Sequence, residues 1–152
     1  MDSSSSSFKG VLLHNGNRLP SIPVFHSSKQ KESYESVQTV MNKINYKKYE
    51  WRICGDFKMI QFVLGQQQGY TKYQCFLCLW NSRDDASHWK TTSWSTRGTL
   101  KKGDLNITNE PLVQPNKIII PPLHIKLGLM SQFVKKMKKD SQSYLYFKKK
   151  FP

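Results

Sequence analysis

Apolar and polar residues alternate along the first quarter of the chain in the pattern of short strands. Residues 8–15 (FKGVLLHN) and 21–26 (SIPVFH) are apolar stretches separated by the turn signal Asn15-Gly16-Asn17, which favours an antiparallel hairpin. Between residues 29 and 45, apolar side chains recur every three or four positions, and this spacing predicts a helix with one buried face. The residues of that face are Tyr34, Val37, Val40, Met41 and Ile44.

The middle of the chain predicts a strand, a helix and a second strand. Residues 51–56 (WRICGD) form a short strand pattern, and residues 57–67 have a helical stripe that ends before Gly69. The run 73–80 (YQCFLCLW) is almost wholly apolar, which is typical of a buried strand. Residues 81–118 are polar and lack periodicity, and irregular segments of this length are often functional or held by a ligand.

The last thirty residues predict basic helices. Pro121-Pro122 favours a helix start, and a second helical turn is expected around residues 144–147. The first helix has an apolar stripe that we expect to face a core, followed by lysines in its last turn, where cations complement the helix dipole. The stripe consists of Leu123, Leu127, Met130, Phe133 or Val134, and Met137.

Strands that alternate with helices after an initial hairpin predict an α/β domain, more exactly an α+β mixed sheet. We expect residues 8–15, 21–26 and 51–56 to share one sheet, with the helix at 29–45 packed on a face of it. The pattern divides the chain into a core at 1–80, an irregular insertion at 81–120 and basic helices at 121–152.

The net charge of the chain indicates the kind of partner that it binds. Lys and Arg total 24 against 10 Asp and Glu, a formal net charge of +14, and such an excess favours a polyanion, above all nucleic acid. No apolar run approaches the roughly 20 residues that span a bilayer, so no membrane partner is expected. Three cysteines make no disulfide framework at this length, which favours a reducing, intracellular location, nuclear if the chain binds DNA.

The positions of the basic residues suggest where a polyanion would bind. Arginines and a lysine are interleaved with Trp80, Trp89 and Trp94, as in sites that combine base stacking with phosphate contacts. The alternative is a satellite hydrophobic cluster with solvated charges around it. The expected nucleic-acid contacts are Arg83, Arg97, Lys135, Lys136, Lys138, Lys139, Lys148, Lys149 and Lys150.

Asp56 is a candidate for chemistry because a predicted strand hands over to a helix at this position. Ligands of open α/β sheets gather at the carboxyl ends of strands, which suits a functional carboxylate. An Asp at the same position also serves as a helix N-cap. Both interpretations stay open from the sequence.

Cys75 and Cys78 have the Cys-x-x-Cys separation that places two thiolates on one zinc ion. Zinc needs two further ligands, and the candidates are His88, His124 and Cys54. The alternative is that both cysteines are small apolar residues of a buried strand.

Several blocks of the sequence resemble a widespread group of transposon-derived animal proteins. The blocks include VLLHNGN, WRICGDFK, GYTKYQCFLCLWNSRDD and PPLHIKLGLMSQFVK, and the resemblance extends from Asp2 to Pro152. That group resembles DDE transposases with a ribonuclease-H-like core. The spacing from Asp56 to the Cys-x-x-Cys pair is also similar to the Transib transposases and the catalytic subunit of the V(D)J recombinase.

The resemblance implies a two-metal phosphoryl-transfer site. In such a core, three strands, a helix, a strand, a helix and a strand follow one another, with one acid on the first strand and another at the end of the fourth. Asp2 and Asp56 match those two positions, and the resemblance implies that they hold Mg²⁺. It also implies that Cys75 and Cys78 hold half of a zinc site.

The sequence departs from that family at the third acid, which lies well downstream in the group and has no match before Pro152. Glu110 falls in the irregular region and does not correspond to it. We therefore expect a truncated, partial ribonuclease-H-like fold that binds DNA and is catalytically incomplete. The alternative is a small basic zinc-stabilised module that binds nucleic acid or protein and has no enzymatic activity.

Overall fold

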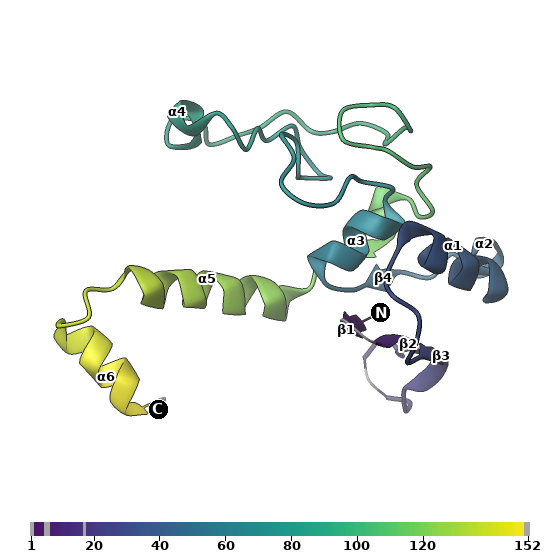
Figure 1. Ribbon diagram of the computed structural model, residues 1–152, viewed down its shortest axis with the longest axis horizontal. Helices are drawn as coiled ribbons and strands as arrows, with labels where there is room; N and C mark the ends of the chain where they lie inside the picture. Colours follow the sequence, from purple (N-terminus) through teal and green to yellow (C-terminus); the bar gives the residue numbers. More distant parts are fainter. Residues whose placement is uncertain (1, 5–6, 17, 151–152) are drawn as a thin grey trace. The chain divides into compact units, whose positions relative to one another are not determined.

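The computed structural model describes residues 2–4, 7–16 and 18–150, with the side chains of residues 2–4 and of His124 outside the description. The described chain forms two compact units, residues 1–120 and 121–152. The expected start of the basic helices coincides with the start of the second unit. Residues 1–80 and 81–120, which the sequence pattern divides, lie together in the first unit. The molecule combines small sheets with several helices, a mixed α/β structure (Figure 1).

The N-terminal strands form a three-stranded antiparallel sheet in the order β1-β2-β3. These strands are β1 (Asp2–Ser4), β2 (Ser7–Leu12) and β3 (Ile22–Ser27). The predicted hairpin between β2 and β3 is confirmed, with Phe8 opposite Ser27 and a register shift after Gly10. Phe8 is fully buried and packs against Phe25, with ring centroids 4.7 Å apart. This aromatic pair joins the sheet to the core.

A second, parallel sheet contains only β4 (Ile53–Cys54) and β5 (Ile118–Ile119). The expectation that residues 51–56 share the first sheet is therefore wrong: Ile53 pairs with Ile118 and Cys54 with Ile119. A local sequence pattern identifies a strand but does not reveal a partner more than sixty positions away. A cleft of about 760 Å³ lies between β2, β3 and residues 51–54, and it contains Cys54.

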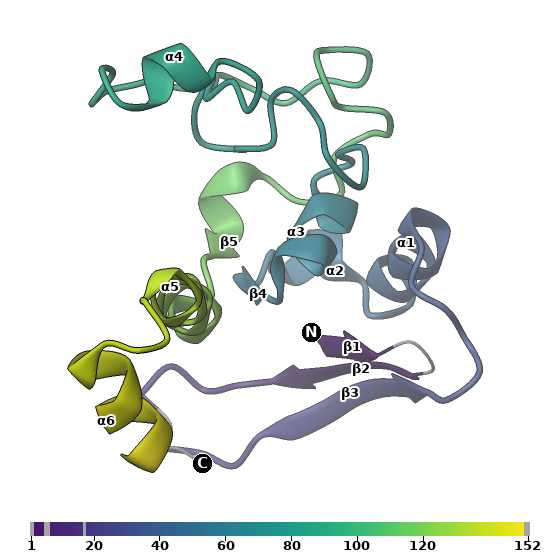
Figure 2. The same ribbon diagram turned by 60° about the vertical axis from the view of Figure 1, so that its left-hand side comes forward.

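The helices of the first unit lie on one side of the three-stranded sheet (Figure 2). They are α1 (Tyr34–Lys43), α2 (Tyr46–Tyr49), α3 (Phe57–Val63), the short α4 (Asp85–His88), and the 3₁₀ turn η1 (Pro115–Lys117). α1 begins later than the periodicity predicts because the Ser33 side chain caps it, accepting from the Ser36 N–H at 3.1 Å. Its predicted apolar stripe faces inward, with Val37 and Met41 buried.

α3 lies at the centre of the core. Four of its residues, Met59, Ile60, Phe62 and Val63, are buried, and they pack in one cluster with side chains from α1, β2 and β4. The helix ends at Val63, with Leu64 as its C-cap before Gly65 at φ +65°, and the predicted end at Gln67 is therefore a few residues too late. A left-handed residue terminates an α-helix, and glycine adopts that conformation at little cost.

The chain leaves the core after α3 and returns to almost the same place. The Gln67 N–H donates to Asn106 O at 2.7 Å, and the Asn109 N–H donates to Gly65 O at 3.0 Å. We call the residues between these contacts the 68–105 loop, which extends from α3 and comes back beside it (Figures 1 and 2). The Tyr34 hydroxyl also donates to Glu110 O at 2.7 Å, so the returning segment is tied to α1.

The predicted buried strand at residues 73–80 is wrong. Within the 68–105 loop this run is irregular, and its one ladder contact is an isolated bridge between Cys78 and Thr96. Phe76 is buried in the core while Leu77 and Leu79 are exposed. The apolar residues of this run therefore act as separate anchors rather than as one strand face.

The second unit consists of α5 (Pro122–Lys136) and α6 (Gln142–Lys150), which confirms both predicted C-terminal helices. Pro122 occupies the first turn of α5, where its missing N–H leaves no intrahelical bond unmade. α6 begins after Ser141, whose side chain accepts from the Tyr144 N–H at 3.2 Å.

Candidate nucleic-acid interface

Seven lysines at the C-terminal ends of α5 and α6 are exposed to solvent. None of them forms an ion pair with any residue that the structure describes. Lysines in the last turns are stabilised by the carbonyl end of the helix dipole, so the helices hold these ammonium groups at the surface without acidic partners. The seven residues are Lys135, Lys136, Lys138, Lys139, Lys148, Lys149 and Lys150.

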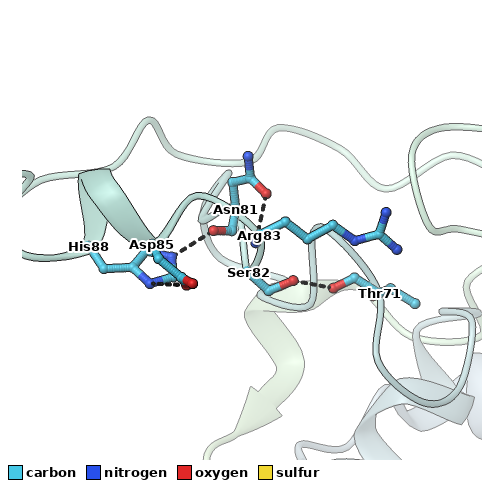
Figure 3. A network of polar contacts seen from close by, with 6 residues as sticks. All are labelled: Thr71, Asn81, Ser82, Arg83, Asp85 and His88. Atoms are coloured by element: carbon cyan, nitrogen blue, oxygen red, sulfur yellow. Dashed lines mark hydrogen bonds and ion pairs between the residues drawn. The ribbon is translucent and has the colours of Figure 1, made fainter.

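Arg83 is exposed and sits in a turn of the 68–105 loop that a polar network fixes (Figure 3). Its N–H donates to the Asn81 side-chain oxygen at 3.1 Å, and the neighbouring Ser82 hydroxyl donates to Thr71 O at 2.8 Å. The guanidinium takes part in neither bond (Figure 3). The backbone is thus held while the charge stays available to a ligand.

Arg97 has a structural role instead, which corrects its expected place among the nucleic-acid contacts. Its guanidinium donates to Cys75 O at 3.0 Å and to the Asn106 side-chain oxygen at 2.8 Å. Burial lowers the pKa of Arg97, and the nearby Cys75 and Asp104 partly offset that effect. These bonds join the two sides of the 68–105 loop, so this charge is used inside the fold.

The tryptophans divide between the two interpretations of the sequence. Trp80 stacks on the His88 ring with centroids 4.9 Å apart, and Trp94 meets the same ring edge-on at 6.2 Å. Trp89, by contrast, is 93 % exposed. Two tryptophans therefore form a satellite cluster around a histidine, and the third presents its ring to solvent.

Asp56 caps α3. Its carboxylate accepts a hydrogen bond from the Met59 N–H at 2.7 Å, which is the usual bond of an N-cap residue. The Asp2 side chain lies outside the described residues. Among the described residues no group of three or more His, Cys, Asp or Glu side chains comes together as a metal site, and of the two implied Mg²⁺ ligands only Asp56 has a described side chain.

Cys75 and Cys78 lie beside each other in the 68–105 loop. Burial raises the pKa of the Cys78 thiol, and a hydrogen bond with Cys75 raises it further. The Leu77 N–H also donates to Cys75 Sγ at 3.4 Å. The pair supplies two adjacent sulfurs, which is half of a tetrahedral zinc site.

The other predicted zinc ligands do not complete that site within the described residues. His88 donates from Nε2 to Asn81 O at 2.7 Å, and its Nδ1 lies 3.6 Å from the Asp85 carboxylate (Figure 3). Cys54 belongs to β4, and the side chain of His124 is outside the description.

A family model described as Domain of unknown function (DUF8703) matches residues 1–113, about three quarters of the chain. The chain belongs to this family. A second model, Domain of unknown function (DUF8704), matches residues 122–152, so the two family segments meet near the division between the two structural units. Searches of the curated proteins and of the solved structures return no match. No helix in the described part of the chain has both the length and the apolar character to cross a bilayer.

Proposed function

We propose that this chain is a transposase-derived, ribonuclease-H-like domain that binds duplex DNA in the nucleus and does not cut it. The observation that carries the proposal is the set of seven exposed lysines in α5 and α6, all without an acidic partner among the described residues. Residues 121–152 contain eight lysines and one acid, Asp140. Such a surface attracts phosphates irrespective of base sequence.

The order of elements supports the ancestry. Three antiparallel strands are followed by α1, α2, β4, α3, α4, η1 and β5. The alternation of strands and longer helices (α1, β4, α3, β5) follows the order that the resemblance implies, whereas β4 and β5 pair in a parallel sheet of their own and do not extend the first sheet. Asp56 lies two residues after the end of β4 and directly before α3, at the position that the resemblance gives to the second acid. The order of elements and the place of Asp56 support the proposed ribonuclease-H-like origin, and the division into two sheets departs from it.

The lack of cleavage follows from the acids. Two-metal phosphoryl transfer needs several carboxylates around the scissile phosphate. Here the Asp56 carboxylate is bonded to the Met59 N–H, and within the described residues it belongs to no cluster of three or more His, Cys, Asp or Glu side chains. The proposal therefore includes DNA binding, which the exposed lysines support, and does not include strand cleavage.

The test combines two assays on the full chain. Fluorescence anisotropy with a labelled duplex is expected to give binding that weakens steeply with salt and changes little between sequences. A supercoiled-plasmid nicking assay with Mg²⁺ or Mn²⁺ is expected to give no cleavage. Metal-dependent nicking that disappears in Asp56→Ala would overturn the catalytic half of the proposal, and absence of duplex binding at low salt would overturn the other half.

The second candidate is a basic zinc-stabilised module without catalysis, favoured by the adjacent sulfurs of Cys75 and Cys78. It requires two ligands beyond this pair. Elemental analysis of the purified chain separates the candidates: one tightly held zinc per chain that Cys75→Ser removes would favour the module.

A further inference from the structure

α5 exposes far more apolar surface than a solvated helix needs. Six of its apolar side chains are between 36 % and 67 % exposed. Large contiguous apolar surface of this kind marks interaction sites. The six residues are Leu123, Ile125, Leu127, Leu129, Met130 and Phe133.

These side chains extend over more than one face of the helix. At about 100° per residue, Leu123, Leu127 and Met130 share one stripe with Phe133 at its margin, while Leu129 and Ile125 lie further round. Together they cover roughly 200° of the circumference. A flat surface reaches at most half of a helix, so a partner that uses all six must close around it.

The charges on α5 restrict the partner further. The helix contains Lys126, Lys135 and Lys136 and no acidic residue, and Lys138 and Lys139 follow it directly. A second copy of this helix would bring like charges together. At about 100° per residue Lys126 and Lys136 both lie within the apolar sector, where a bilayer would have to bury their ammonium groups, whereas an acidic rim would pair with them.

From this geometry we propose that α5 is a binding site for an acidic protein whose apolar, methionine-lined groove closes around a helix. Calcium-loaded calmodulin has that chemistry: its opened helix pairs expose a Met-rich groove to basic amphipathic helices. Methionine side chains adapt to irregular anchors such as the Leu129 and Ile125 flank. The inference uses the apolar residues of α5 and does not depend on DNA binding.

The test uses the full chain and calmodulin as the probe, by isothermal titration at about 150 mM salt, in Ca²⁺ and in EGTA. We expect a Kd of about 1 μM or tighter in Ca²⁺ and no binding in EGTA, where the groove is closed. Leu129→Gln is expected to weaken binding about tenfold or more. The matched control, Ser131→Gln, places the same side chain on the opposite side of α5 and is expected to change affinity less than about twofold.

Both variants keep every lysine, so their affinity for duplex DNA is expected to equal that of the parent chain. Measuring DNA affinity alongside calmodulin affinity therefore distinguishes a failure of this inference from a failure of the proposed DNA binding. Absence of binding in Ca²⁺, equal binding in EGTA, or equal affinity of Leu129→Gln and the parent would overturn the inference. So would tight binding to phosphatidylserine-containing vesicles without binding to calmodulin, because that result would assign the apolar residues to lipid.

Discussion

At the residue scale, two arginines of the 68–105 loop have the same charge and different surroundings. Arg97 donates to Cys75 O and Asn106, whereas Arg83 is exposed and its guanidinium takes part in none of the neighbouring polar bonds (Figure 3). Arg97→Ala is expected to lower the free energy of unfolding by about 1–3 kcal/mol, because it leaves acceptors without donors. Arg83→Ala is expected to stay within about 0.5 kcal/mol of the parent.

Urea unfolding followed by tryptophan fluorescence measures both changes, and duplex affinity provides the reverse comparison. Arg83→Ala is expected to weaken DNA binding modestly through the loss of one phosphate contact. Equal stability of the two variants would contradict the structural role of Arg97.

Asp56 allows a second comparison, between capping and charge. Asp56→Ala removes the acceptor of the Met59 N–H and is expected to cost about 1 kcal/mol, while Asp56→Asn retains a good N-cap and costs a few tenths. Urea midpoints with and without Mg²⁺ measure this. If Asn is as destabilising as Ala, or if Mg²⁺ stabilises only the parent chain, the carboxylate does more than cap α3.

The sequence identifies the cap position of Asp56 as one of two interpretations, but it does not indicate the contacts of Arg97. A strand pattern followed by a helical stripe identifies a cap position, because the capping hydrogen bond joins two residues only three positions apart in the chain, Asp56 and Met59. The acceptors of Arg97 lie 9 and 22 positions away, in segments with no regular periodicity, so no local pattern points to them. The same limit applies to His88, whose contacts with Trp80 and Asn81 depend on the path of the loop.

At the element scale, the end of α3 depends on Gly65. Its φ of +65° is unfavourable for other residues, and a Cβ there would overlap the carbonyl oxygen of Asn109. Gly69 also has a positive φ, but nothing lies within 4 Å of a Cβ at that position.

Gly65→Ala is therefore expected to destabilise the chain by about 2–4 kcal/mol, from backbone strain and the overlap together. Gly69→Ala, which tests strain alone, is expected to cost about 1 kcal/mol. Thermal unfolding by circular dichroism compares the two. Equal losses would mean that the returning segment does not pack against Gly65.

Elements with a long or capped pattern were predictable, and elements defined by distant partners were not. α1, α5 and the β2-β3 hairpin follow from their own periodicity and turn residues, since α1 buries one face, α5 begins at a proline and the hairpin closes one turn. β5 has only two residues and exists because β4 lies beside it. The run at 73–80 has the composition of a strand, but no described strand lies beside it. Its apolar side chains are buried individually, as Phe76 is, and not as one face.

At the scale of the whole molecule, the positive charge is unevenly distributed between the two units. Residues 121–152 have eight lysines against one acid, while Lys58 and Lys117 of the first unit are paired with Glu32 and Glu50. Phosphate contacts are expected to come from the unpaired set, because a paired lysine must first give up its carboxylate.

Replacing Lys149 and Lys150 together by Gln is expected to reduce the slope of log K against log salt by about 1.8, which corresponds to two phosphate contacts. The matched double variant, Lys58→Gln with Lys117→Gln, removes the same charge and is expected to change the slope by less than half as much. Anisotropy titrations from about 50 to 200 mM salt measure both slopes. Equal effects would mean that binding reports net charge rather than a defined surface.

Hydrogen bonds at residues 65–67 and 106–109 hold the two ends of the 68–105 loop together. The stability of the core therefore depends little on how long the loop is. Because Gln67 meets Asn106 and Gly65 meets Asn109, the two ends stay together whatever the chain does between them. Doubling such a loop costs only about 0.6 kcal/mol in closure entropy, provided that the core anchors Phe76 and Leu100 are kept. Insertions at the exposed Trp89-Lys90 turn would thus be tolerated where the same additions within α1 or α3 would not, and this turn is the natural place for a peptide tag or a reporter domain.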